Sequence, residues 1–293
     1  MNHLAIETKS ILLDKLIKDY DLHSKDVAEA VELYYDAQKL RIMHANKERS
    51  EGPGELVSWF AFWLELGEKV LASKLQKWVK GDQAPAEAKW AIQQIGIGPI
   101  IAAGLAAHID VTKAGSISAL WKFAGLAPGF DHKTKGTKLP YNSRLKTLCW
   151  KLGESFVKFS GKDGAVYGKL YTQFKSDEIS RNENGLYKSA AQAQLASKKF
   201  KTDNATKLRL LEGKLSDGHL HARAKRRAVK IFLSHYWTVA REARSLPLRE
   251  PYAIAILKHD GKIEARVVEE PMLSERAGSP EKTTIRKRAS HGE

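Results

Sequence analysis

The sequence predicts a mostly α-helical protein, built as a helical bundle with a short hairpin of two helices at its centre. Three observations lead to this fold class. Apolar residues recur three and four positions apart along most of the chain, which is the spacing of one helix face. Breaks that contain Gly and Pro separate these stretches. A hydrophobic content of 43% supplies enough side chains for a sizeable core.

Residues 1–80 are predicted to form an N-terminal helical region. Its longest helical pattern runs from Leu56 to about Lys80 and is rich in aromatic residues. These include Trp59, Phe60, Trp63 and Trp78. Because the neighbouring residues are not basic, we expect the rings to build a core rather than to stack on nucleic-acid bases.

Residues 81–159 contain the central hairpin. A short helix from Ala86 to Gln94 leads into Ile95-Gly96-Ile97-Gly98, and Pro99 then opens a second helix, where proline is favoured. Both glycines permit positive φ angles and leave room for close approach by another backbone. The backbone N–H groups of the turn and of the second helix's first turn would then form a phosphate-sized anion site.

The remaining chain divides into three predicted parts. Residues 160–218 form a polar insertion, residues 219–273 form a basic C-terminal helical region, and residues 274–293 form a disordered basic tail. Within the second part, Asp260-Gly261 stands between apolar runs, which leaves a small C-terminal β-hairpin open.

The charge balance predicts a polyanionic partner. The chain has 293 residues, with 49 Lys and Arg against 34 Asp and Glu, so its net charge is +15. The first 70 residues are nearly balanced, and the excess lies later in the chain. A segregated basic excess is typical of a nucleic-acid-binding surface. DNA is the favoured partner, RNA remains open, and a solvated basic surface is the alternative without a ligand.

No membrane partner is predicted. The longest apolar stretch, Ile95–Ala107, is shorter than the roughly 18 residues that a membrane-crossing helix needs. The first residues lack the basic start and apolar block of a signal peptide. The sequence therefore predicts a cytoplasmic, nucleoid-associated protein.

Three groups of residues are predicted to contact DNA. The hairpin contributes Gly96, Ile97, Gly98 and Ile100. The following basic loop contributes Lys133, Lys135, Lys138, Arg144 and Lys146. A basic helix contributes Arg223, Arg226 and Arg227, whose spacing predicts one shared side. Such contacts to phosphate position a protein but read no base sequence.

The hairpin resembles the helix-hairpin-helix (HhH) DNA-binding motif, and its surroundings resemble a larger family. The hairpin is followed by a helix that ends in Gly125-Leu126-Ala127-Pro128, by a basic loop, and by NSRLKTLCWKLGESFVK. This order is similar to the C-terminal, HhH-bearing domain of the bridge-RNA-guided insertion-sequence transposases. The resemblance covers about a quarter of the chain. It implies a DNA-gripping protein of recombination or transposition.

Two departures from that family concern catalysis. No N-terminal RNase H-like domain with acidic catalytic residues is visible in the sequence. The family has a serine just after Gly-Leu-Ala-Pro, whereas this loop offers Thr134, and Ser143 stands further on. We therefore expect DNA binding, and leave open whether the chain is an enzyme.

A glycosylase-like, base-flipping enzyme is the alternative reading of the hairpin. Such enzymes often carry a lysine just after the hairpin and an aspartate beyond it. Ile100 occupies the lysine position here, and Asp110 is the nearby acid. Asp110, Thr134 and Ser143 are thus the weak catalytic candidates.

No cofactor or metal is predicted. Cys149, the single cysteine, lies in an apolar helical pattern and is expected to be buried. His219 and His221 lack an evident third ligand. A homo-oligomer and a catalytic partner protein both remain open.

Overall fold

The computed structural model describes residues 3–52, 54–129, 135–197, 199–200 and 204–248. Within these residues the chain is helical and contains no strand, which confirms the mostly α-helical prediction. The predicted C-terminal β-hairpin and the predicted basic tail lie outside the described residues.

The helices follow one another with short connections over most of the chain. In order they are α1 (His3–Lys18), α2 (Val27–Glu51), α3 (Glu55–Lys80), α4 (Ala86–Gln93), α5 (Pro99–His108), α6 (Ile117–Phe123), α7 (Ser143–Lys158), α8 (Val166–Glu183), α9 (Lys188–Ser197), α10 (Ala205–Leu211) and α11 (Asp217–Glu242). A short 3-10 helix, Ser24–Asp26, precedes α2.

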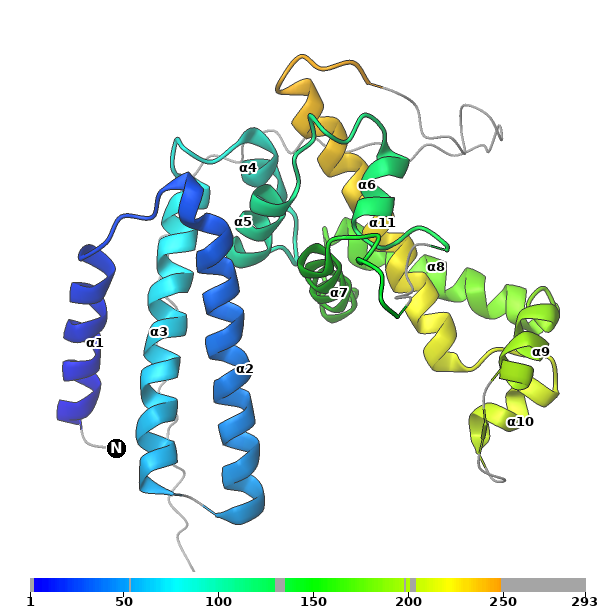
Figure 1. Ribbon diagram of the computed structural model, residues 1–293, viewed down its shortest axis with the longest axis horizontal. Coiled ribbons are helices and arrows are strands. Elements are labelled where there is room, and N and C mark those ends of the chain that lie inside the picture. The colour runs from blue at the N-terminus through cyan, green and yellow to red at the C-terminus, as the bar shows by residue number, and fades with distance from the viewer. Residues whose placement is uncertain (1–2, 53, 130–134, 198, 201–203, 249–293) are drawn as a thin grey trace, which may run out of the picture.

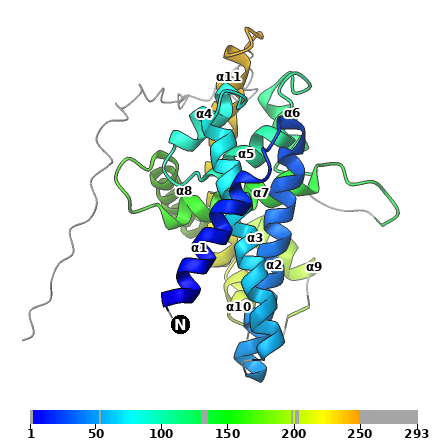
Figure 2. The same cartoon turned by 90° about the vertical axis from the view of Figure 1, so that its left-hand side faces the viewer.

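Helices α1, α3 and α2 lie side by side in one layer, and the lower part of α2 and α3 projects from the rest of the molecule (Figures 1 and 2). We call the hairpin of α2 and α3 the arm. Its two helices are joined by the ion pair of Arg41 with Glu68, at 2.5 Å, and by the Ser58 hydroxyl, which donates to Glu48 at 2.6 Å. The chain reverses at Gly52, where a φ of +92° favours glycine.

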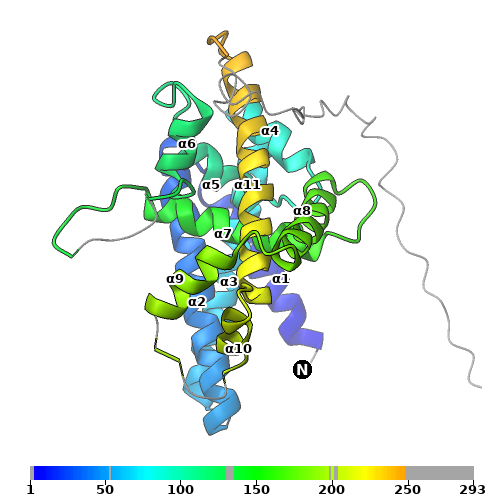
Figure 3. The same cartoon turned by 90° about the vertical axis from the view of Figure 1, so that its right-hand side faces the viewer.

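The remaining helices form the body around α11, with α6 and α7 on one side and α8 on the other (Figure 3). Its centre is a cluster of aromatic rings. The ring centroid of Phe232 lies 5.5 Å from that of Trp90 and 5.1 Å from that of Tyr167, and Phe156 stacks on Tyr167 at 5.2 Å. Buried aromatic side chains of this size dominate the energetics of a core.

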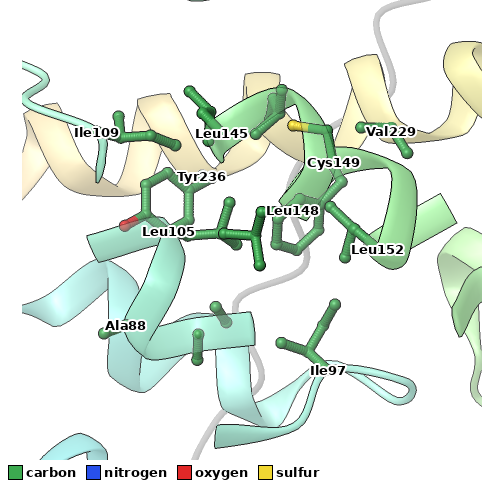
Figure 4. Close-up of a cluster of buried hydrophobic side chains, with 14 of the residues drawn as sticks. Ala88, Ile97, Leu105, Ile109, Leu145, Leu148, Cys149, Leu152, Val229 and Tyr236 are labelled. Atoms are coloured by element: carbon green, nitrogen blue, oxygen red, sulfur yellow. The ribbon is translucent and has the colours of Figure 1, made fainter. Parts of the chain in front are cut away.

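Helix α5 joins the arm to the body. It packs against α2 and α3 on one side and against α4 and α7 on the other. Gly104 makes this possible, because a Cβ there would lie 2.9 Å from Leu148 of α7 and 3.3 Å from Val31 of α2. The core around α5, shown in Figure 4, is continuous from Val27 to Ala240. Residues of the arm, of α4–α8 and of α11 therefore contribute to one core.

Polar contacts anchor the C-terminal end of α11. The Trp237 indole N–H donates to the carbonyl of Ala114 at 2.7 Å, and Arg241 donates to the carbonyl of Val111 at 2.9 Å. Arg244 forms a two-point ion pair with the buried Glu87 of α4, at 2.8 and 2.9 Å. Bidentate pairs of this kind fix orientation as well as distance.

The predicted polar insertion divides into two structural parts. Helix α8 belongs to the main core through Tyr167, Tyr171 and Phe174. Helices α9 and α10 instead form a small separate cluster, in which Ala191 and Leu210 pack with residues that lead into α11. These three aromatic residues of an otherwise polar segment therefore pack α8 against the body.

The prediction of an aromatic core along α3 is wrong for the distal half of that helix. Trp78 is buried, but Trp59, Phe60 and Trp63 are 58%, 40% and 43% exposed. The physical reason is the length of the arm. Twenty-six residues span about 39 Å at 1.5 Å per residue, and the body covers only the end near Trp78.

Cys149 is buried among Leu145, Leu148 and Leu152, as its apolar pattern predicted (Figure 4). Burial raises the pKa of its thiol to about 12, which makes it a packing residue. Across the described helices, no segment is both long and apolar enough to cross a bilayer.

Candidate nucleic-acid interface

The turn between α4 and α5 has one glycine with a positive φ. Gly96 has a φ of +96°, and a Cβ there would lie 3.3 Å from the ring of Phe159. Gly98 has a φ of −89° and open space around its Cα, so it does not use the positive φ that glycine permits. The reason is that Gly98 is the N-cap of α5, a position with extended backbone that does not require glycine.

The backbone donors of this turn come from the start of α5. The N–H of Ile97 donates within the turn, to the carbonyl of Gln94 at 3.0 Å, and its side chain is buried (Figure 4). The N–H groups of Ile100 and Ile101 lie in the first turn of α5, where helix geometry provides no acceptor. The helix dipole adds partial positive charge there. The hydroxyl of Ser155 in α7 braces the turn by donating to the carbonyl of Gly96.

The basic loop between α6 and α7 is only partly described. Lys133 and Thr134 lie outside the described residues, whereas Lys135 and Lys138 are exposed. The ammonium of Lys146 lies 4.1 Å from the ring centroid of Tyr141. Arg144 turns away, towards the arm, and pairs with Glu32 at 2.5 Å.

The three arginines of α11 have different surroundings. Arg223 pairs with the buried Glu178 of α8 at 2.5 Å. Arg227 lies over the ring of Phe174 at 4.0 Å, 3.5 Å from Asp177. Arg226 is exposed. Of the three, Arg223 and Arg227 therefore have acidic partners on α8, and Arg226 is the most exposed.

Lys230 is a second cation near Arg226 on α11. It follows Arg226 by one helical turn, and its ammonium lies 4.8 Å from the ring centroid of Trp121 in α6. Burial lowers the pKa of Lys230, and the charge of Arg226 lowers it further. Two cations thus stand close together at the junction of α6 and α11.

An exposed tryptophan extends this surface across α7. Trp150 is 61% exposed and follows Lys146 by one turn. The Lys225 ammonium lies 5.9 Å from its ring centroid and pairs with Glu154. We call the set on α6, α7 and α11 the basic aromatic face. Its members are Trp121, Tyr141, Lys146, Trp150, Arg226 and Lys230.

Sequence reasoning missed Trp150. It stands in the run Leu148-Cys149-Trp150, where two buried neighbours make it look like a third core residue. Its four-residue spacing from Lys146 was the available signal, because that spacing puts both side chains on one side of the helix.

Asp110, one of the weak catalytic candidates, takes part in a turn. Asp110 accepts from the N–H and hydroxyl of Thr112, at 3.0 and 2.6 Å, and pairs with Lys113 at 3.2 Å. The hydrogen bond from the Thr112 side chain is the largest cause that lowers the pKa of Asp110. The carboxylate therefore closes a turn rather than acting as a base.

Ser143 opens α7 and lines a cavity of about 310 Å³ together with Glu32 and His108. Burial lowers the pKa of His108. Among the described residues, no cluster of three His, Cys, Asp or Glu side chains is placed to hold a metal ion. His221 instead shares a hydrogen bond with the hydroxyl of Tyr171, at 2.7 Å.

Comparison with protein-family models, with curated proteins and with solved structures finds no match to this chain. The basic aromatic face and the turn between α4 and α5 are therefore the features from which we infer function.

Proposed function

We propose that this protein binds DNA through the phosphate backbone, with the basic aromatic face as the main contact. The observation that carries the proposal is the pair Arg226 and Lys230, one turn apart, with Lys230 beside the Trp121 ring. Two adjacent cations repel each other, and an anion between them relieves that repulsion. The lowered pKa of Lys230 reflects this crowding and its burial.

An exposed ring beside these cations favours a nucleic acid over a simple anion. Trp150 offers a ring face for stacking on an unpaired base or a sugar, while Lys146 and Arg226 reach phosphates. Aromatic rings interleaved with cations are the usual composition of a surface that follows a nucleic-acid strand.

The turn between α4 and α5 supplies a second backbone contact. Helix α7 carries Lys146 near one end and Ser155, which braces Gly96, near the other. Nine residues of helix separate them, or about 14 Å. Since each DNA strand carries a phosphate about every 3.4 Å of helix axis, the two contacts would be about four phosphates apart.

The finer part of the proposal concerns the biological process. The resemblance to the HhH-bearing domain of bridge-RNA-guided transposases supports a role in DNA recombination or transposition. In that role this chain would grip DNA, and a partner protein would supply strand cleavage. Asp110, used as a turn acceptor, gives no support to the base-modifying alternative.

A salt titration of binding tests the proposal. Wild-type protein should bind duplex DNA with an affinity that falls steeply with salt. Replacing Arg226 and Lys230 by alanine should reduce the slope of log K against log [salt] by about 2, since each lost phosphate contact contributes about 0.9. Lys39 and Lys80, exposed on the arm, provide a charge-matched alanine control whose slope should stay near wild type.

The choice of nucleic acid and the products sharpen the result. Branched DNA and structured RNA are titrated in parallel, and all products are examined for cleavage or altered bases. Tighter binding to RNA than to every DNA would replace DNA by RNA in the proposal. An absence of binding by wild type, or equal slopes for the two double variants, would overturn it.

A further inference from the structure

The arm exposes an unusual amount of apolar surface. Besides Ile42 and Met43, six large apolar side chains of α2 and α3 are exposed. They are Leu33 at 52% exposure, Leu40 at 39%, Leu56 at 76%, Trp59 at 58%, Phe60 at 40% and Trp63 at 43%. With side chains of about 150–250 Å² each, these fractions leave roughly 600 Å² of apolar area exposed. Patches of that size on a monomer mark interaction sites.

Most of these side chains lie on one side of the arm. Leu40 and His44 are one turn apart on α2, and the His44 ring contacts the Phe60 ring of α3 at a centroid distance of 5.5 Å. Trp63 follows Phe60 by three residues and therefore lies on the same side of α3. The two helices thus contribute to one continuous face, which we call the arm seam.

The spacing along the arm seam is that of a helix-pairing surface. On α3 the seam runs Leu56, Phe60, Trp63, Gly67 and Val70, with alternating steps of four and three residues. On α2 it runs Leu33, Ala37, Leu40 and His44, with the same alternation. This heptad spacing is the one by which helices pack side by side at a shallow angle. The contact between α2 and α3 also uses residues outside the seam, such as Arg41 and Glu68.

The charge of the arm separates it from the rest of the chain. Residues 27–80 contain eight acidic and eight basic residues, so the whole net charge of +15 lies elsewhere. A neutral arm has no excess charge to attract a polyanion. It can, however, approach an identical arm without net repulsion, whereas two copies of the basic body repel each other.

From these observations we propose that the arm seam binds the arm seam of a second copy of this chain. The two hairpins form an antiparallel four-helix bundle with two-fold symmetry, in which each arm presents the same surface. The exposed large side chains of the seam leave roughly 500 Å² from each copy, which is below the ~800 Å² per partner of a standard interface and gives about the 1,000 Å² in total that a specific interface needs. The basic bodies then lie at opposite ends of the bundle.

Sedimentation equilibrium on the full chain tests this dimer. Wild type should be dimeric at micromolar concentration, and the variant Leu40→Glu with Trp63→Glu should be monomeric, with dimerisation weakened at least 100-fold. Leu186→Glu with Leu211→Glu is the matched control. It places the same charges on exposed apolar residues outside the arm, and it should stay dimeric.

Two further measurements keep the test decisive. Circular dichroism checks helix content, and the milder pair Leu40→Ser with Trp63→Ser replaces the glutamates if they unfold the arm. Amine cross-linking of wild type should link Lys39 or Lys47 of one copy to the arm of the other. A monomeric wild type would overturn the proposal. So would intermolecular links confined to the body, or a dimer that only the control variant disrupts.

Discussion

The arm and the basic aromatic face both expose tryptophan rings, yet the rings have different neighbours. On the arm, the ring centroid of Trp63 lies 6.2 Å from that of Trp59 and 5.6 Å from that of Phe62. On the basic aromatic face, a lysine ammonium lies within 6 Å of the ring centroids of Trp121 and Trp150. Rings packed on rings favour a protein partner, whereas rings interleaved with cations favour a nucleic acid. The surroundings of an exposed ring therefore say more about its partner than its exposure does.

The largest expected effect compares a buried tryptophan of the body with an exposed one of the arm. Trp237→Ala removes a fully packed ring and its hydrogen bond to Ala114, so we expect a loss of about 3–5 kcal/mol in unfolding free energy. Trp59→Ala should cost less than about 1 kcal/mol in the isolated chain. Urea unfolding at several protein concentrations measures both. Equal losses would contradict the division into a packed body and an uncovered arm end.

A second test separates the two surfaces by ligand. Trp150→Ala should weaken binding to single-stranded DNA by about tenfold, since a stacked base contributes roughly 1–3 kcal/mol. Trp59→Ala should leave that affinity unchanged, because its ring lies on the arm. Fluorescence anisotropy with a labelled oligonucleotide gives both affinities. If the two variants weakened binding equally, the distinction by neighbouring cations would fail.

A third test concerns the turn between α4 and α5. Gly98→Val adds bulk at an open site whose φ a side chain tolerates, so the thermal midpoint should stay within a few degrees of wild type. Phosphate would no longer reach the first turn of α5, and we expect duplex affinity to fall about fivefold. Gly115→Val, at another open glycine, is the control and should bind normally.

Gly96→Val distinguishes fold from binding at the same turn. It forces a β-branched residue to a φ of +96° beside Phe159, which costs of order 1–3 kcal/mol. Its thermal midpoint should therefore drop where that of Gly98→Val does not. A Gly98→Val protein with normal affinity would remove the turn from the proposed contact.

The smallest effect is the pH dependence at the junction of arm and body. Burial lowers the pKa of His108 in the folded state, with Arg144 lowering it and Glu32 raising it to smaller extents. The unfolded chain therefore binds more protons below its pKa of about 6.5, and stability falls as pH drops below that value. His108→Gln should flatten the decline in thermal midpoint from pH 7 to pH 5.5. An unchanged slope would place the pH sensitivity at other groups, such as His221.

Helix periodicity was enough to predict the helical class, the breaks near Gly52 and Gly81, and the burial of Cys149. Helix periodicity did not predict the exposure of Trp59 and Trp63. A stripe of apolar residues marks one face of a helix, but it does not tell whether another part of the same chain packs on that face. Local spacing also did not predict the ion pairs of Arg223 and Arg227. Their acidic partners on α8 lie about 45 residues away in sequence, beyond the reach of local spacing.

Under the proposed function, Gly104 would have a consequence for the geometry of the bound DNA. Its missing side chain lets α5 press against both α2 and α7, so the arm and the basic aromatic face are held at a fixed mutual orientation. In a dimer joined through the two arms, the two basic aromatic faces would then lie at a fixed distance from each other. The same groove of DNA faces the protein about every 10–10.5 base pairs. Such a dimer would therefore favour duplexes in which its two contact sites are separated by a whole number of helical turns. Spacing along the DNA, rather than base sequence, would be the quantity that this protein measures.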